Sequence, residues 1–314
     1  MRYQFPKCAH TLKCAFIMSI LLSYTSYAAQ IDLLVLYDDA VDEFEQGSPE
    51  SLIRAYVDAT NVFFENSGLD IEFRITDTRN FDENFSNIDA STMLERITAS
   101  PLVWQWRNEA GADLVVQLSR LLGEENARLC GIAWLAQGGF FDVDNGFSVV
   151  RPACGPITMA HEIGHNMGLN HSRAGGEVGG IYEYGLGYGV DGAFATIMTT
   201  GGTFMAQSIA RFSDPEATCS DLPCGVPITE NDSANAVLAL NNVKDRIAAY
   251  RDTVVSNTGR ISIPGSPNTP VINPTDPPNN QPDSGSKSGG QITPFIFGLI
   301  LLFGWFRTFT YRAP

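Results

Sequence analysis

The segment from His161 to His171 constrains the chain more than any other feature, because it reads His-Glu-Ile-Gly-His-Asn-Met-Gly-Leu-Asn-His. On a helix, His161 and His165 lie one turn apart on one face and present two imidazole nitrogens to one metal ion. Gly168 can adopt a positive φ, so the chain can turn there and bring His171 to the same ion. Three neutral imidazoles leave a fourth position for water, which is typical of a catalytic zinc site.

The residue after the first histidine, Glu162, has the chemistry of a general base. Zinc lowers the pKa of a bound water and polarises a carbonyl group, while a neighbouring carboxylate can take the water's proton and pass it to a leaving amine. The only histidine outside the motif is His10, near the N-terminus. The alternative is that these are hydrogen-bonded histidines of the core, but that would not explain why three of the four histidines lie in one motif. The sequence therefore predicts one catalytic Zn²⁺ held by His161, His165 and His171.

The motif is followed downstream by Thr196-Ile197-Met198-Thr199. This combination resembles the metzincin metallopeptidases, whose zinc motif precedes a methionine turn, and within them the bacterial reprolysin-like (adamalysin-related) proteins. The resemblance implies that Met198 forms the floor beneath the metal without binding it, whereas a lone methionine would be core filler. Two departures leave the subfamily open. Ser172 stands where reprolysins usually have Asp, and Thr199 stands where astacins and serralysins have Tyr, so no tyrosine ligand is expected.

The resemblance extends over roughly residues 30–251 and implies an α/β (α+β) catalytic domain. Its expected core is a five-stranded twisted mixed sheet with an active-site helix and a C-terminal helix. The hydrophobic patterns independently predict a mixed sheet covered by helices. Ser48-Pro49 opens one helix, Gly68 ends it, and Ser100-Pro101 interrupts another. The predicted strands are residues 31–37, 69–77, 112–118, 131–136 and 147–150, and the predicted helices are residues 48–66, 88–110 and 231–251 besides the motif helix.

Residues 131–135 read Gly-Ile-Ala-Trp-Leu and come before the motif helix. The resemblance implies that a strand at this place is an edge that pairs with extended substrate. An unpaired edge gives backbone affinity without selecting side chains. An ordinary core strand is the equal alternative.

The first 28 residues have the pattern of a secretory signal. Arg2, Lys7 and Lys13 form a positive region, residues 14–22 are apolar, and residues 26–28 (Ser-Tyr-Ala) form a cleavage site. A membrane anchor is the alternative, although the apolar run is short for a bilayer. The pattern predicts export.

Export would place four of the six cysteines in an oxidising compartment, because Cys8 and Cys14 belong to the signal. Four cysteines allow three pairings. Proximity favours Cys219 with Cys224 and leaves Cys130 with Cys154, and free buried thiols are the alternative. No cysteine lies between residues 29 and 129, so a cysteine switch that hides the metal is not expected.

Residues 254–290 are rich in Pro, Asn, Ser and Gly and have no hydrophobic periodicity, which predicts a disordered linker. Residues 291–314 combine an apolar run with Arg307 and Arg312 after Gly289-Gly290. This order resembles the GlyGly-CTERM sorting tail of Gram-negative exported proteins, which implies a transmembrane sorting segment that is later removed. A permanent membrane anchor is the alternative, and the apolar run is near the lower length limit for a span.

The formal net charge of −15 argues against nucleic acid as a partner. The two terminal segments carry Arg and Lys but no acid, so the remaining chain is more negative still. Asp142, Asp144 and Asn145 before Gly146 indicate a Ca²⁺ ligand set only weakly, since the other loop ligands and a closing Glu are missing. We interpret them as a polar hairpin turn.

These features predict a zinc metalloendopeptidase domain at residues 29–253 that hydrolyses extracellular proteins or peptides. The protein is expected to be secreted or held at the surface of a Gram-negative-type bacterium, and its expected partners are its substrates and the export and tail-processing machinery. The alternative is a surface binding protein or adhesin that keeps the fold and cleaves little, although such a protein has no need of Glu162. A narrowly specific toxin protease would share the same chemistry.

Overall fold

The computed structural model describes residues 28–42, 48–83, 85, 88–120, 129–137 and 143–254. Strands alternate with helices in the order that the sequence predicts, and a helix closes the domain. The larger elements are β1 (Ala29–Tyr37), α1 (Asp39–Asp42), α2 (Pro49–Asn66), β2 (Ile71–Asn80), α3 (Ala90–Ala99), α4 (Pro101–Ala110), β3 (Leu114–Leu118), β4 (Gly131–Ala133), β5 (Phe147–Val150), α5 (Ile157–Asn166) and α6 (Ala236–Ile247). Short 3-10 turns cover Val143–Asn145, Pro152–Cys154 and Arg173–Gly175.

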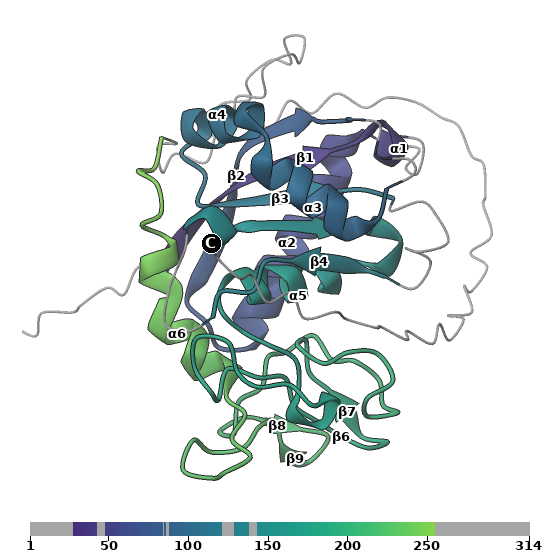
Figure 1. Cartoon of the computed structure of the whole chain (residues 1–314). Coiled ribbons are helices and arrows are strands. Elements are labelled where there is room, and N and C mark those ends of the chain that lie inside the picture. Colours follow the sequence, from purple (N-terminus) through teal and green to yellow (C-terminus); the bar gives the residue numbers. More distant parts are fainter. Residues whose placement is uncertain are drawn as a thin grey trace, which may run out of the picture.

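Five strands form one mixed sheet in the order β2-β1-β3-β5-β4, as predicted (Figure 1). The neighbours from β2 to β5 are parallel, and β4 is antiparallel to β5. Among the residues that the structure describes, β4 is the last strand in this order, so the prediction of an edge strand is confirmed there for Gly131–Ala133. Trp134 and Leu135 lie beyond the strand.

The sheet is buried on both faces, which explains the continuous apolar run of β1. Ile31, Leu33 and Val35 enter one core together with residues of α2, α5 and α6. Leu34 and Leu36 point to the opposite side and enter a second core with residues of α3 and α4. Figure 1 shows α3 and α4 covering one face of the sheet, with α2 and α5 on the other side. On that side, helix α5 packs against the strands β4 and β5.

Local signals explain where the helices begin and end. Pro49 lies in the first turn of α2, where its missing N–H is tolerated. Ser100 divides the predicted segment 88–110 into two helices, because it follows α3 with an extended backbone and its side chain caps α4. Gly111 ends α4 in a left-handed conformation.

Residues 167–235, called here the lower region, contain little regular structure and lie below the sheet in Figure 1. Their strands have two residues each: β6 (Gly189–Val190) pairs with β7 (Phe194–Ala195), and β8 (Thr218–Cys219) pairs with β9 (Leu222–Pro223). Backbone hydrogen bonds between distant segments join these loops, including those of Asn170 N with Gly185 O and Ile197 N with Arg211 O. The described part of the chain outside the lower region is called the upper region.

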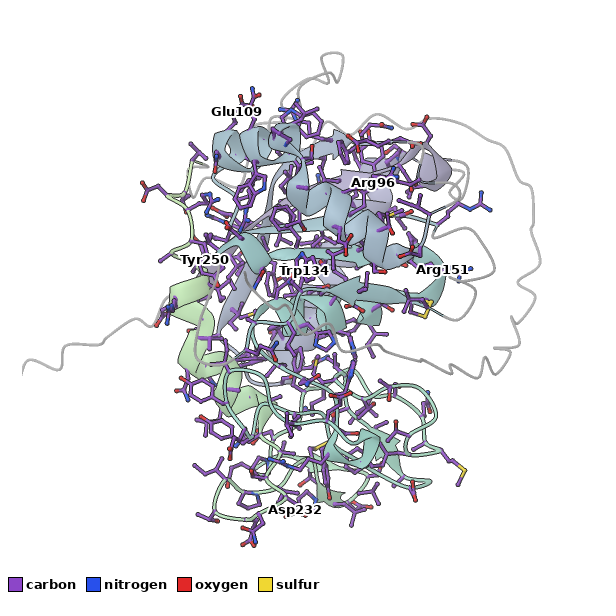
Figure 2. All side chains as sticks on the ribbon, viewed as in Figure 1. Arg96, Glu109, Trp134, Arg151, Asp232 and Tyr250 are labelled. Carbon is purple, nitrogen blue, oxygen red and sulfur yellow. A yellow bond between two sulfur atoms is a disulfide. The ribbon has the colours of Figure 1, made fainter. Side chains whose placement is uncertain are left out.

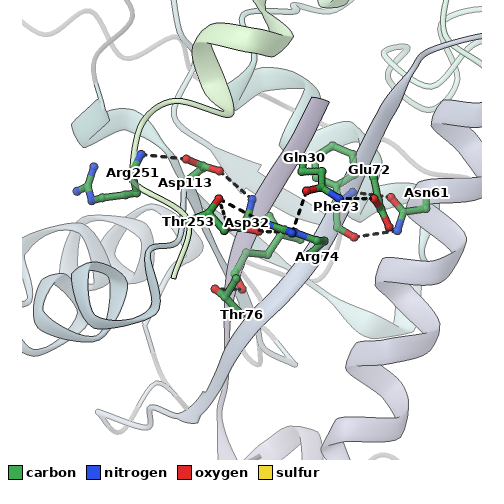
Figure 3. Close-up of polar contacts among 11 residues, drawn as sticks. Gln30, Asp32, Asn61, Glu72, Phe73, Arg74, Thr76, Asp113, Arg251 and Thr253 are labelled. Atoms are coloured by element: carbon green, nitrogen blue, oxygen red, sulfur yellow. Dashed lines mark hydrogen bonds and ion pairs between the residues drawn. The ribbon is translucent and has the colours of Figure 1, made fainter. Parts of the chain in front are cut away.

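A polar cluster fixes the segment that follows α6 to the start of the sheet (Figure 3). The buried carboxylate of Asp32 accepts hydrogen bonds from Arg74, at 2.8 and 2.9 Å, and from the Thr253 hydroxyl at 3.1 Å. Asp113 accepts from the backbone N–H of Asp32 on one oxygen and from that of Arg251 on the other. The last described residues are therefore bound to β1 and to the residue that precedes β3.

Within the described residues, no helix has the length and apolar character needed to cross a membrane. The predicted signal (residues 1–28), linker (254–290) and sorting tail (291–314) lie outside the described residues, apart from residues 28 and 254. They stay predictions.

Candidate metal centre

Three histidines meet between the upper and lower regions. His161 and His165 belong to α5, and His171 follows the helix after a turn. The Nε2 atom of His165 lies 3.1 Å from that of His161 and 3.1 Å from that of His171, and the third separation is 3.2 Å. Among the described residues, these three form the one cluster of His, Cys, Asp or Glu side chains close enough together to hold a metal ion.

Backbone carbonyls determine which ring nitrogens of two histidines carry protons. The Nδ1–H of His161 donates to the Ile197 carbonyl at 2.7 Å, and the Nδ1–H of His165 donates to the Leu169 carbonyl at 2.9 Å. A carbonyl accepts but cannot donate, so Nδ1 is the protonated nitrogen of each neutral ring. Both Nε2 atoms consequently present lone pairs to the same point, as a metal site requires.

The donor set fits a tetrahedral zinc ion. Nitrogen ligands about 2.0–2.1 Å from such an ion lie roughly 3.3 Å from one another, close to the separations seen here. Lone pairs that face one another at hydrogen-bonding distance repel unless a proton or a cation lies between them. Two of the three rings already use their protons on carbonyls. The cluster can therefore hold a cation with three ligands and leave a further coordination position open.

The surroundings keep the three imidazoles neutral. Burial lowers the pKa of His161, although the hydrogen bond to Ile197 opposes this shift. Burial and the neighbouring His161 lower the pKa of His165 to about 3. Burial, together with His165 and His161, also lowers the pKa of His171. Neutral rings are the form that binds a metal, so no proton has to be displaced near pH 7.

Glu162 follows the first histidine and is only 2 % exposed. Its Oε2 atom has no hydrogen-bond partner, and burial raises the pKa of the carboxyl group well above the ordinary value. The carboxylate lies against β4, since a Cβ built on Gly131 would be 2.5 Å from Oε1. Glu162 directly follows a candidate metal ligand in the sequence, and a buried carboxylate without a partner is a candidate for proton exchange during a reaction.

The turn after α5 delivers the third histidine. Gly168 has a φ of 87°, in the left-handed region that the sequence predicts for it, and a Cβ there would be 2.4 Å from Ile181. Asn170 then pairs with the segment around Leu186, and its side-chain oxygen accepts from the N–H of His171 at 2.8 Å. The position of His171 thus depends on contacts within the lower region.

Met198 lies beneath the helix that carries two of the histidines. A Cβ built on Gly164 would be 2.6 Å from the Met198 sulfur, so the glycine allows this close approach. On the other side, a Cβ on Gly187 would be 2.4 Å from the Met198 carbonyl oxygen. The preceding residue, Ile197, holds His161 through its carbonyl. Met198 is fully buried between these glycines.

Both disulfides have the pairing that proximity favours. Cys130 is bonded to Cys154 and Cys219 to Cys224. The first joins the residue before β4 to the turn after β5, and Figure 2 shows a disulfide close to Arg151 at this end of the strands. The second closes the hairpin of β8 and β9 in the lower region. The first disulfide therefore secures the edge strand beside Glu162.

The sequence did not reveal several groups that complete the site. The carbonyls of Ile197 and Leu169 orient two histidines, and no side-chain pattern encodes a carbonyl position. Gly131 gives space to Glu162, and its only signal was a glycine in a predicted strand, which can mark a close approach. Within its described part, the structure adds no ligands to the Ca²⁺ site that the sequence weakly indicated. Asp142 lies outside the described residues, and Asp144 and Asn145 form a 3-10 turn.

Comparisons with known proteins agree with this geometry. The model of metallo-peptidase family M12 matches residues 27–213. A peptidyl-Asp metalloendopeptidase of Pseudomonas aeruginosa is 31 % identical over 287 residues, which cover 82 % of this chain and 47 % of the relative. A second protein of that name, from Xanthomonas campestris pv. campestris, is 26 % identical over 226 residues, with 70 % of this chain and 51 % of the relative covered.

The chain thus spans about half the length of these two relatives. A solved structure described as a chaperone-substrate complex aligns with a TM-score of 0.57 over 71 % of this chain and 35 % of the other, at 21 % identity. That likeness concerns the fold alone. The family match covers more than half of the sequence and contains the histidine cluster, so the chain belongs to metallo-peptidase family M12.

Proposed function

We propose that this protein is an exported zinc metalloendopeptidase that hydrolyses peptide bonds in extracellular proteins. The observation that carries the proposal is the convergence of three histidine Nε2 atoms within 3.2 Å of one another, with Glu162 next to the first ligand. Membership of family M12 supports the same activity. His161, His165 and His171 would hold the metal.

A zinc ion bound by these residues would polarise a substrate carbonyl and lower the pKa of a bound water to near 7. The protein's own groups do the remaining work. Glu162 would accept a proton at its free oxygen and pass it to the leaving amine. The carbonyls of Ile197 and Leu169 keep the proton of each ring on Nδ1, so that Nε2 stays available to the metal. Met198 would support the ligand helix from below.

The free side of β4 would bind the substrate backbone. Strand β4 pairs with β5 on one side and lies at the edge of the sheet, and its Gly131 adjoins Glu162. An extended peptide could add to this edge as another strand, which would place its backbone alongside the metal site. Main-chain pairing gives affinity for many sequences, so side-chain preference must come from other residues.

We further propose a preference for aspartate beside the scissile bond. Both relatives are named for action at peptidyl-Asp. A chain of net charge −15 repels acidic peptides unless a local cation compensates. Between residues 157 and 235, the sequence has two arginines and no lysine. Arg173 donates to the carbonyls of Ser233 and Glu183, so its guanidinium is already engaged.

Arg211 is the candidate cation. The Arg211 carbonyl accepts a hydrogen bond from the N–H of Ile197, and the Ile197 carbonyl accepts one from His161. The Arg211 backbone is therefore connected to a predicted metal ligand through a single residue. The residue is half-buried, and its neighbour Phe212 is fully buried in the core. A partly desolvated guanidinium recognises a carboxylate well, because it can donate two parallel hydrogen bonds.

Two disulfides and the predicted signal support an extracellular location. We propose that residues 29–253 are the exported catalytic domain, that residues 254–290 link it to residues 291–314, and that this last segment serves membrane sorting. Cleavage of the tail by a processing enzyme remains part of this proposal, and a permanent anchor is its alternative.

The central test compares the purified full chain with Glu162→Ala and Glu162→Gln on a mixed peptide library, with zinc content measured for each. We expect about one zinc per chain in all three proteins, and a fall in kcat/KM of roughly 10²–10⁴-fold in both variants. Glu216→Ala is the matched control, because Glu216 is exposed. It should keep full activity.

Each other outcome has a distinct meaning. Zinc binding without cleavage of any peptide by the unaltered chain would favour the binding protein or adhesin. Lack of zinc in the unaltered chain would overturn the assignment of the three histidines. Cleavage that persists in Glu162→Gln would remove Glu162 from the reaction.

The aspartate preference is tested with paired peptides that differ only by Asp or Asn next to the scissile bond. We expect Arg211→Gln to lower kcat/KM for the Asp peptide at least tenfold and to change the Asn peptide little. Arg54→Gln, at an exposed position of α2, should change neither. Equal losses on both peptides would show that Arg211 has a structural role instead.

A further inference from the structure

We propose that Gly131 is a positioning residue that sets the location of the Glu162 carboxylate. This inference rests on the proposed role of Glu162. A Cβ added to Gly131 would lie 2.5 Å from Oε1, 2.7 Å from Cγ and 2.8 Å from Cδ of Glu162. All three separations are shorter than ordinary contact between heavy atoms. No side chain larger than hydrogen fits at position 131 while Glu162 keeps its place.

The need for glycine at this position comes from space and not from backbone conformation. Gly131 lies in β4, paired with Val150, and its φ is outside the left-handed region. Any residue could adopt this backbone. Gly155 differs, because it has a φ of 86° and a Cβ there would meet nothing within 4 Å. The glycine in β4 is therefore explained by its neighbour across the sheet–helix interface.

The strand cannot easily move away from an added methyl group. Gly131 pairs with β5, and the preceding residue, Cys130, is bonded to Cys154. The carbonyl of Cys130 also accepts a hydrogen bond of 2.7 Å from the N–H of Arg151. These constraints fix both the residue before Gly131 and the strand beside it.

Helix α5 is constrained as well, both by the lower region and by the strands. Gly164 lies against the Met198 sulfur, and Asn166 donates hydrogen bonds to three carbonyls, those of Trp134, Asn145 and Phe147. With the strand and the helix both fixed, the Glu162 side chain is the part that must give way. Its carboxylate would then leave the position against β4 from which we propose that it acts. A displacement of about 1 Å at a reacting group can reduce a rate by roughly a hundredfold.

The first arm of the test measures Gly131→Ala in the full, zinc-loaded chain. We expect zinc content to stay at the level of the unaltered chain and kcat to fall at least tenfold, with a smaller change in KM. Gly175→Ala is the matched control: its φ is ordinary and the nearest neighbour of an added Cβ is 3.9 Å away. Full activity of Gly131→Ala would overturn the proposal.

The second arm needs no activity, so it separates this inference from the proposed function. The midpoint of thermal unfolding is compared for the unaltered chain, Gly131→Ala, Glu162→Ala and the double variant. We expect Gly131→Ala to lower the midpoint by roughly 5 °C when Glu162 is present and by about 1 °C or less in the Glu162→Ala background. Equal shifts in the two backgrounds would show that the methyl group meets the backbone instead, and would overturn the inference.

The same arm decides the case in which Gly131→Ala fails to fold. The double variant with Glu162→Ala should then fold, because the colliding atoms are removed, and failure of both variants would contradict the proposal. If the unaltered chain cleaves no peptide while the unfolding midpoints shift as expected, the proposed function is wrong. The contact between Gly131 and Glu162 would still stand.

Discussion

The upper and lower regions of the molecule are stabilised in different ways. The upper region has a five-stranded sheet with an apolar core on each face. The lower region has two-residue strands, and its own core cluster contains Phe194, Cys219 and Cys224 as buried members. Backbone hydrogen bonds and close approaches of glycines join its loops, and Leu169, Ile197, Met198 and Phe212 pack into the core that it shares with the sheet. Burial of apolar side chains between the sheet and its helices stabilises the upper region. In the lower region, the Cys219–Cys224 disulfide and a metal ion bound to His171 should contribute a larger share of the stability.

The candidate metal centre connects these two regions. Helix α5 of the upper region carries His161 and His165, and His171 belongs to the lower region. An ion bound by all three would act as a cross-link between a stable part and a weaker one. The comparison therefore predicts that metal binding stabilises the lower region more than the upper region.

Removal of the metal should give the largest effect. A ligand present at a thousandfold excess over its dissociation constant stabilises the native state by about 4 kcal/mol. Treatment with a chelator should lower the unfolding midpoint and increase amide hydrogen exchange between residues 170 and 235, with smaller increases in β1 and β3. The measurement is hydrogen exchange followed by mass spectrometry, before and after chelation.

His171→Ala tests the same cross-link from one side. It should reproduce the exchange pattern of the chelated protein in the lower region while α5 stays protected. A uniform increase in both regions would show that the two parts unfold as one unit, which would contradict the inferred difference in their stability.

The two disulfides should differ in the stability that they provide. Chain-entropy estimates give about 3.5 kcal/mol for closing the loop of Cys130–Cys154 and about 2 kcal/mol for the shorter loop of Cys219–Cys224. Paired Cys→Ser variants, unfolded in denaturant, measure these losses. Because Cys219 and Cys224 close only the short hairpin of β8 and β9, this smaller loss should appear mainly as local exchange around these two strands. A global loss for Cys219–Cys224 that equals or exceeds the other would contradict this ranking.

The smallest predicted effect concerns a buried carboxyl group of the upper region. Burial raises the pKa of Asp38 to about 6, while a hydrogen bond from Ser119 opposes the shift. A folded-state pKa above the unfolded value gives stability that is present below pH 3.8 and is lost as the pH rises through about 6. Asp38→Asn should therefore raise the free energy of unfolding by about 1–2 kcal/mol at pH 8.

The same substitution should give no gain at pH 4, where the Asp38 carboxyl group is already neutral in the folded state. Denaturant unfolding at the two pH values makes the measurement. Ser119→Ala gives a useful control, since loss of the hydrogen bond should destabilise the protein more at pH 8 than at pH 4. An equal effect of Asp38→Asn at both values would show that its charge is not the cause.

Short-range signals made the metal ligands predictable. His161 and His165 are one helical turn apart in sequence, and Gly168 shows the turn to His171, so the whole group lies within one local segment. The strands of the upper region were predictable because short alternating or continuous apolar runs, bounded by turn residues, are typical of strands. The helix 48–66 was also predicted within a residue of its observed bounds, since Pro49 and Gly68 mark both ends.

The remaining features depend on contacts between distant segments. The strand order, with β4 at the edge, follows from pairing across the sheet and has no local signal. The lower region has few periodic apolar runs, so its backbone pairing could not be predicted. Gly131 and Glu162 are distant in sequence, and only the packed structure reveals that one makes room for the other.

The polar cluster around Asp32 has a mechanical consequence. Thr253 and Arg251 hold the end of the described chain to β1 and to Asp113 at the start of β3, next to the bidentate pair of Asp32 and Arg74. A pulling force applied through any later residues would reach the first and third strands before it reached α5. If the protein is tethered at its C-terminus, the central sheet would carry that load, and the geometry of the metal ligands would be shielded from it.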